Sequence, residues 1–263
     1  MDATPQRDTE FYFDTITFLV DNIIFKVPSQ YIHEESEVFG AGAQISAQSD
    51  EGSSDANPVK LSPLPHGCSA EDFRHLLRII VALTVKLPTP KSYSLEQWLS
   101  VLKLSTAWFF SDIRTLAMGE VTASTSHYTN DQWITVLDFA HSQGSDRFSD
   151  LRDLAITRIS GFNFSSKVDQ VLMGRKYLHK PWIIQGLRDL VNASALPSLK
   201  ELTRLGQNTV LTLLYMAFQR AQSMGTNRGY HHSYSYRGPY NDVEVEEYFV
   251  DEIISLFPVS RPS

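Results

Sequence analysis

One stretch in the middle of the chain occurs twice. Residues 93–102 (YSLEQWLSVL) resemble residues 128–137 (YTNDQWITVL) at an offset of 35 (128 minus 93). Residues 112–117 (DIRTLA) resemble residues 150–155 (DLRDLA) at an offset of 38 (150 minus 112), so the second copy carries three extra residues. Each copy has the pattern of a helix, a break and a second helix. The duplication therefore predicts two equivalent helical hairpins.

Both copies begin with a polar pair at capping-box spacing, Ser94 with Gln97 and Thr129 with Gln132. An apolar stripe follows in each copy. Its members are Trp98, Val101 and Leu102 in the first copy, and Trp133, Val136 and Leu137 in the second. A lone hairpin cannot bury such a stripe, so we expect the copies to stack on each other or on the preceding segment. The tryptophans are expected in the core rather than as anchors for a partner.

The N-terminal part has the pattern of a small sheet. Residues 11–20 and 23–27 are rich in aromatic and β-branched residues, and Asp21-Asn22 between them suits a tight turn. Residues 58–61 form a third strand candidate. Short helices are expected at 29–35 and 36–39, then a loop at 40–57, then a helix capped by Ser69. We therefore expect an α+β domain at residues 11–122.

The remainder of the chain is predicted to be an all-helical extension. It spans residues 123–224 and contains the second copy of the tryptophan unit. Residues 225–242 are rich in Gly, Tyr, His and Ser without periodicity, which is typical of a flexible linker. Residues 243–257 have the pattern of an acidic amphipathic helix. Its apolar stripe consists of Val245, Phe249, Ile253 and Leu256. Such a helix either fills a partner's groove or packs on its own protein.

The composition disfavours several classes of partner. The formal net charge is −7 and no run of Lys or Arg occurs, so direct nucleic-acid binding is not expected. No apolar stretch approaches the length of a membrane span. The single cysteine, Cys68, cannot form an internal disulfide. We therefore expect a cytoplasmic or nuclear protein without a membrane partner.

No motif assigns catalytic, cofactor-binding or metal-binding residues. The sequence lacks a G-x-S-x-G elbow and an H-E-x-x-H motif. His66 lies two residues before Cys68 and could activate it, but an ordinary free thiol is the favoured interpretation. His231-His232 lie in the expected linker without further ligands at metal spacing. We predict no cofactor.

Residues 11–122 resemble a BTB/POZ domain. Residues 14–20 (DTITFLV) resemble the family's opening strand, residues 25–27 (FKV) its second strand, and residues 73–77 (FRHLL) the helix after its third strand. Residues 98–117 and 168–177, followed by Trp182, are similar to segments of the BTB proteins common in mushroom-forming fungi. The fold class implied is a BTB/POZ-like small sheet with a helical cluster.

The resemblance also has departures. Pro28 stands where many animal members have a histidine, and the residues after Phe39 are rich in Gly and Ala where the family commonly has an apolar helix. The second departure bears on the surface by which some relatives bind cullin ubiquitin ligases.

The function expected is non-catalytic protein–protein interaction, with the BTB-like part forming a homodimer as the resemblance implies. The candidate dimer interface comprises Phe11, Phe13, Ile16, Phe18 and Val20, since a lone edge should not expose so apolar a strand. An adaptor that links a ubiquitin ligase or scaffold to a target is the alternative. A hydrolase and a transcription regulator are less favoured.

Overall fold

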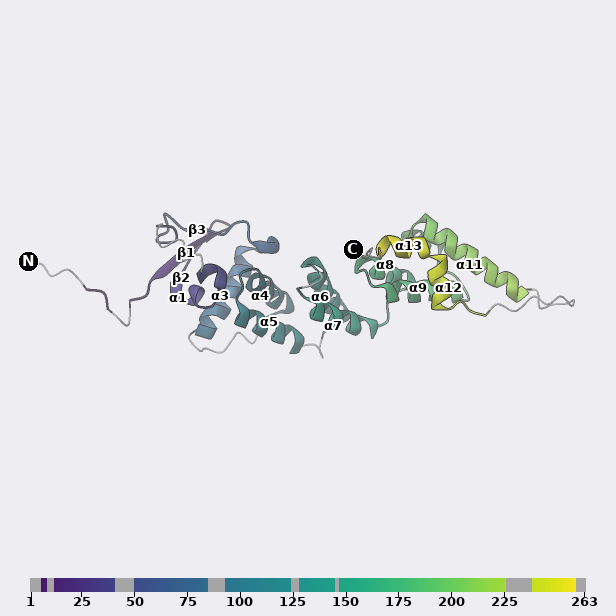
Figure 1. Cartoon of the computed structure of the whole chain (residues 1–263), viewed down its shortest axis with the longest axis horizontal. Coiled ribbons are helices and arrows are strands. Elements are labelled where there is room, and N and C mark those ends of the chain that lie inside the picture. Colours follow the sequence, from purple (N-terminus) through teal and green to yellow (C-terminus); the bar gives the residue numbers. More distant parts are fainter. Residues whose placement is uncertain are drawn as a thin grey trace, which may run out of the picture. The chain divides into compact units, whose positions relative to one another are not determined.

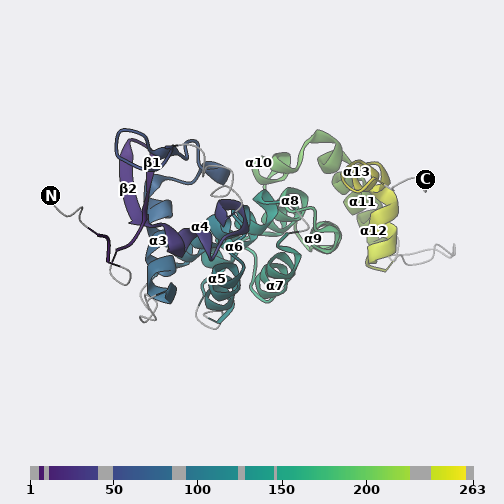
Figure 2. The same ribbon diagram turned by 60° about the vertical axis from the view of Figure 1, so that its left-hand side comes forward.

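The computed structural model describes residues 6–8, 12–40, 50–84, 93–123, 128–144, 147–225 and 238–258. The chain divides into two compact units, Met1–Ile159 and Ser160–Ser263 (Figures 1 and 2). The described residues are mostly helical, and a small three-stranded sheet lies in the first unit. This arrangement confirms the expected α+β class.

The sheet is built on the predicted hairpin. Strands β1 (Thr15–Val20) and β2 (Ile23–Pro28) pair antiparallel, and the short β3 (Val59–Lys60) pairs parallel with β1, which gives the order β2-β1-β3. Asp21 and Asn22 have φ angles of 47° and 62°. Positive φ at both central residues is typical of a type I′ turn, whose twist suits a two-residue hairpin loop. The Asp-Asn pair therefore sets the register of the hairpin.

Helices cover one face of this sheet, as the beginning of the chain in Figure 2 shows. They are α1 (Ser29–His33), a helical turn at 37–40 and α3 (Ala70–Thr84), which the 3-10 helix η1 (Pro65–Gly67) precedes. The Phe18 ring on β1 meets the rings of Phe39 and Phe73 edge-on, at 5.7 and 5.6 Å between centroids. Trp108 extends this aromatic cluster through contacts with the same two rings. Edge-to-face pairs of this kind add specific stabilisation to burial.

The duplicated sequence folds into two equivalent pairs of helices. The first copy forms α4 (Leu95–Ala107) and α5 (Ser111–Ala123), and the second forms α6 (Asn130–Ser142) and α7 (Ser149–Ser160). Both predicted capping boxes are present. The Tyr93–Trp98 and Tyr128–Trp133 ring centroids lie 5.2 and 5.3 Å apart, so the copies also share local packing. The prediction of two equivalent hairpins is confirmed.

The two copies pack together within the first unit. Helix α4 contacts α6, and the Arg114 guanidinium of α5 donates to the carbonyl of Arg147 and lies over the Phe148 ring. Trp98 and Trp133 are buried, as are Trp108 and Trp182, so core packing of all four tryptophans is confirmed. The compact unit extends to Ile159 and so includes both copies, whereas the domain was expected to end at residue 122.

The second unit is all-helical. Its elements are α8 (Lys167–Lys176), α9 (Lys180–Asn192), α10 (Leu199–Leu202), the 3-10 helix η3 (Thr203–Leu205), α11 (Gln207–Gly225), α12 (Asp242–Tyr248) and α13 (Val250–Leu256). Helices α8 and α9 approach closely at two glycines. A Cβ on Gly186 would lie 2.7 Å from a Val171 methyl, and one on Gly174 would lie 2.7 Å from Ile183. Glycine is therefore required by the helix crossing at both positions.

The expected linker has a structured end. Residues 226–237 lie outside the described residues, but Tyr240 is buried in the core of the second unit. Its backbone N–H donates to Asn192 Oδ1, and its carbonyl accepts from Asn192 Nδ2. The linker prediction is therefore wrong for Tyr240, because two hydrogen bonds to the Asn192 side chain and burial in the core fix this residue.

Candidate functional site

The predicted dimer surface is mostly directed into the first unit. Phe18 and Val20 are fully buried and Ile16 is half-buried, while Phe13 is 51% exposed and Phe11 lies outside the described residues. Alternate residues of a strand share one face, and Phe18 and Val20 lie on the face that the helices cover. The prediction that Phe18 and Val20 form a dimer surface is therefore wrong.

The open side of the sheet is the outer edge of β2. On the side of β1 away from β2, the Thr17 N–H donates to the Gly52 carbonyl and the Leu19 carbonyl accepts from the Leu61 N–H. Toward β2, the Asp14 carbonyl accepts from the Ser29 N–H. In an antiparallel ladder, alternate residues direct their backbone groups toward and away from the paired strand. The same alternation directs the N–H and C=O groups of Ile24 and Lys26 away from β1. Strand β2 ends the described sheet, so these groups meet no further strand of it.

Apolar side chains accompany this edge. Ile23 and Ile24 are 40% and 45% exposed, and Tyr12 and Phe13 before β1 are 51% exposed. The predicted interface lies on and before β1 and does not include the exposed Ile23-Ile24 pair of β2. Hydrophobic alternation identifies the two strands of a hairpin, but the position of the third strand decides which of them forms the edge.

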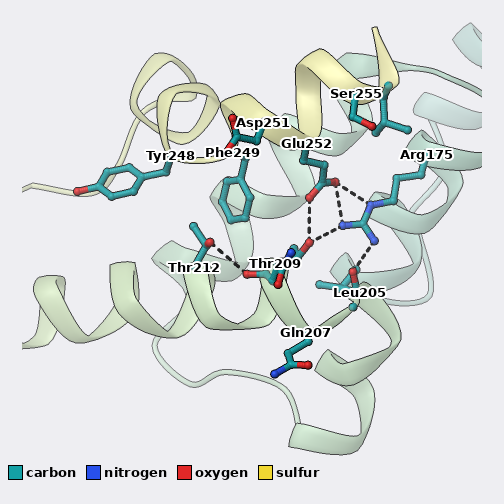
Figure 3. Close-up of a pocket in the computed structure, with 13 residues that line it drawn as sticks. Arg175, Leu205, Gln207, Thr209, Thr212, Tyr248, Phe249, Asp251, Glu252 and Ser255 are labelled. Atoms are coloured by element: carbon teal, nitrogen blue, oxygen red, sulfur yellow. Dashed lines mark hydrogen bonds and ion pairs between the residues drawn. The ribbon is translucent and has the colours of Figure 1, made fainter. Parts of the chain in front are cut away.

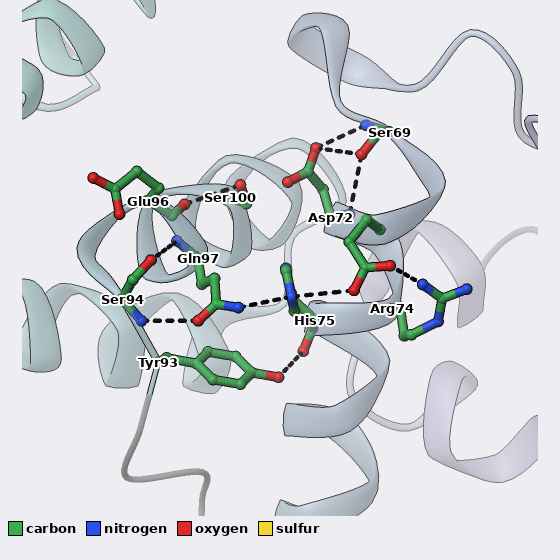
Figure 4. A network of polar contacts seen from close by, with 10 residues as sticks. Ser69, Asp72, Arg74, His75, Tyr93, Ser94, Glu96, Gln97 and Ser100 are labelled. Atoms are coloured by element: carbon green, nitrogen blue, oxygen red, sulfur yellow. Dashed lines mark hydrogen bonds and ion pairs between the residues drawn. The ribbon is translucent and has the colours of Figure 1, made fainter.

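A polar network joins α3 to α4 in the first unit (Figure 4). The His75 ring is buried, with its Nε2 3.1 Å from the Gln97 side-chain nitrogen and 3.5 Å from a Glu71 carboxylate oxygen. Tyr93 Oη donates to the His75 carbonyl at 3.1 Å. Burial, reinforced by the Arg78 cation, lowers the pKa of His75. The Asp72 carboxylate acts in the opposite direction and raises the pKa of His75, but it does not offset the burial and the Arg78 cation.

This network positions helices rather than a nucleophile. Gln97 belongs to the capping box of α4 and contacts His75 at the same time. The nearby Cys68 is not activated, because burial and then the Asp72 carboxylate raise its pKa to about 11. The thiol is therefore protonated at neutral pH. The His66 side chain lies outside the described residues.

A cavity of about 780 Å³ lies in the second unit between the start of α11 and α13 (Figure 3). Arg175 lies at its wall and donates to Glu252 at 2.8 Å, to the Leu205 carbonyl at 2.7 Å and to Thr209 Oγ1 at 2.8 Å. Thr209 Oγ1 in turn donates to the second Glu252 oxygen at 2.9 Å. The charged groups of this network bond to one another, so they tie α13 to α8 and α11.

The predicted partner helix is part of the second unit's own core. The chain breaks at Phe249 into α12 and α13, and Val245, Phe249 and Ile253 are buried while Leu256 packs beside them. Its acidic face is also engaged, since Asp242 pairs with Arg188 and Glu246 with Lys180 of α9. The prediction that Val245, Phe249, Ile253 and Leu256 bind a partner is therefore wrong, and the alternative that this segment packs on its own protein holds.

Metal-ligand clusters and membrane-spanning helices are both absent from the described part of the chain. No group of three or more His, Cys, Asp and Glu side chains is placed there to hold a metal ion. None of the described helices combines the length and the apolar character that a membrane span requires. His231-His232 lie outside the described residues.

Comparison of the chain with protein-family models, with curated proteins and with solved structures finds no match. A function must therefore be argued from the surfaces of the molecule itself. Of the sites described above, the polar networks join helices of the same unit, whereas the edge of β2 pairs with no further strand among the described residues.

Proposed function

We propose that the chain is a non-catalytic protein-interaction module whose BTB/POZ-like part, residues 11–122, self-associates through the edge of β2. The order of elements supports the BTB/POZ-like part of the proposal. The described elements occur in the order hairpin, two short helical segments, third strand and longer helix. The segments that resemble the family occur in the same order along the chain.

The observation that carries the proposal is the open edge of β2. Ile24 and Lys26 direct backbone donors and acceptors outward, and two exposed isoleucines accompany them. Exposed edges of this kind are templates for pairing with another strand, and Lys26 and Pro28 limit this edge to the backbone groups of Ile24 and Lys26. A second copy supplies an identical strand, and antiparallel pairing of two identical edges is twofold symmetric.

The adaptor alternative has weaker support. It relied on the final amphipathic segment, whose apolar residues Val245, Phe249 and Ile253 are buried in their own unit. A ligase- or scaffold-binding role would have to use another surface. Self-association through the hairpin is therefore the function that the geometry supports best.

Light scattering after size exclusion tests this proposal on the full chain. Lys26→Pro removes an outward-directed N–H, and proline is tolerated at such an edge position. Ile24→Lys places a charge on the same edge. We expect either change to lower the molar mass of the assembly by half or more at micromolar concentration.

Ile254→Lys is the matched control, because Ile254 is an exposed isoleucine in the second unit. It should leave the molar mass of the assembly unchanged, because the substituted residue lies outside the β2 edge. A wild-type monomer, or an assembly that both edge variants leave intact, would contradict the proposal. Circular dichroism confirms that each variant is folded.

A further inference from the structure

Helix α11 is apolar on two opposite faces. Leu213 and Met216 on its inner face are fully buried in the core of the second unit. Leu211, Leu214, Tyr215 and Phe218 lie on the outer face and are between 40% and 58% exposed. We call these four residues the outer stripe. A contiguous patch of exposed apolar side chains marks an interaction surface, so we expect a partner to cover the outer stripe.

The outer stripe carries no charge. Arg220 is the one charged residue in the sequence of α11, and its guanidinium donates to the carbonyls of Val191 and Ala193 in the same unit. An acidic or basic partner helix would therefore gain no ion pair from the side chains of the outer stripe itself. The chain as a whole has a net charge of −7, so two copies would meet here with the least like-charge repulsion.

The spacing of the outer stripe is symmetric. Its members stand at positions i, i+3, i+4 and i+7, and this series reads the same in both directions along the helix. A twofold axis between positions 214 and 215 places Leu211 of one copy against Phe218 of the other, and Leu214 against Tyr215. Each contact then joins a leucine to an aromatic ring. The helices run antiparallel, which also aligns their dipoles favourably.

We propose that the outer stripe of α11 pairs antiparallel with the same stripe of a second copy, forming a contact separate from the β2 edge. The two surfaces lie in different units of the chain. A chain with two independent twofold contacts assembles beyond a dimer, because each copy binds one twin through each surface. This inference does not depend on self-association through the hairpin.

The size of the surface predicts a reversible contact. Four side chains exposed to this extent offer on the order of 400 Å² of apolar surface, comparable with the largest patches on monomeric proteins. Tyr248 extends it, since its ring centroid lies 6.3 Å from that of Tyr215. A stable interface buries about 800 Å² per partner. We therefore expect dissociation on dilution.

Sedimentation equilibrium of the full chain over a range of concentrations tests the pairing. The variant Leu211→Gln/Phe218→Gln removes both ends of the outer stripe without touching the buried face. We expect it to weaken the α11 contact by about tenfold or more, because it removes both Leu211–Phe218 contacts of the symmetric pair. Combined with Lys26→Pro, it should give a monomer of 29.8 kDa.

Ile254→Gln is the matched control, because Ile254 is an isoleucine of similar exposure on α13 of the same unit. It should not weaken association. If Lys26→Pro alone gives a monomer, or if the α11 variant associates as tightly as the wild type, pairing through α11 is overturned. If the α11 variant dissociates and Lys26→Pro has no effect, α11 pairing stands and the hairpin proposal fails. The thermal midpoint of each variant shows that it is folded.

Discussion

Two apolar stripes of the second unit differ in burial. The stripe of α12 and α13, with Val245, Phe249 and Ile253, is buried in its own unit, although its sequence resembles a partner-binding helix. The outer stripe of α11 is exposed, although the opposite face of the same helix is buried in the core. A helix with one apolar stripe needs one neighbour to bury it, whereas α11 has two stripes and the described residues of its own unit cover one. A second apolar stripe on a helix is thus a better sign of a partner-binding surface than amphipathicity alone.

The largest expected effect contrasts two phenylalanines on these stripes. Phe249→Ala removes a buried ring from the core and should lower the free energy of unfolding by about 3–5 kcal/mol. Phe218→Ala removes an exposed ring and should change the stability of the dissociated chain by less than about 0.5 kcal/mol. Urea unfolding at low protein concentration measures both. Equal losses in the two variants would show that the stripes do not differ in burial.

A second contrast tests how tightly the second unit is packed. Gly186→Ala should lower the free energy of unfolding by about 1–3 kcal/mol, because the new Cβ would overlap a Val171 methyl and approach the Lys167 carbonyl. Gly119→Ala in α5 is the control, since a Cβ at this position would meet no atom within 4 Å. It should stabilise the chain by up to about 1 kcal/mol through helix propensity. Thermal unfolding gives the sign of each change.

The part-buried ion pair that anchors α13 can be compared with an exposed ion pair of the same unit. Glu252→Ala leaves the part-buried Arg175 without its carboxylate and should cost about 1–3 kcal/mol of unfolding free energy. Asp242→Ala breaks the exposed pair with Arg188 and should cost less than about 1 kcal/mol. Denaturant midpoints of the two variants, compared in parallel, check the order. A larger loss for Asp242→Ala would contradict the anchoring role of Glu252.

The smallest expected effect is a pH dependence of the first unit. Burial lowers the pKa of His75 below its ordinary value of 6.5, so the unfolded chain takes up the proton first. Stability is then unaffected well above pH 6.5 and falls as the pH drops through and below that value. We expect the unfolding midpoint of His75→Asn to fall less than that of the wild type on acidification. An identical pH dependence in both proteins would remove His75 as a cause.

Local features of the fold were predictable from sequence because neighbouring residues determine them. Asp21-Asn22 specified the hairpin turn, and Ser94 with Gln97 specified the start of α4. The second copy repeated these signals, so its helices could be predicted by analogy with the first.

Features that depend on distant contacts could not be predicted in this way. Phe18 and Phe13 lie on the same hairpin, and only the packing of α3 against the sheet makes one buried and the other exposed. Tyr240 follows a stretch without periodicity, and its burial depends on Asn192 of α9. The candidate surfaces were misassigned for the same reason, because exposure is a property of the assembled unit.

Disulfide trapping tests the pairing of α11 most directly. In a Cys68→Ser background, Tyr215→Cys places a thiol beside the proposed twofold axis, where it faces its twin. Gln207→Cys places the two thiols roughly 22 Å apart along antiparallel helices, at 1.5 Å per residue. We predict that mild oxidation gives covalent dimers of the Tyr215→Cys protein and leaves the Gln207→Cys protein monomeric on a non-reducing gel. Equal cross-linking of the two proteins, or none at position 215, would contradict the antiparallel pairing.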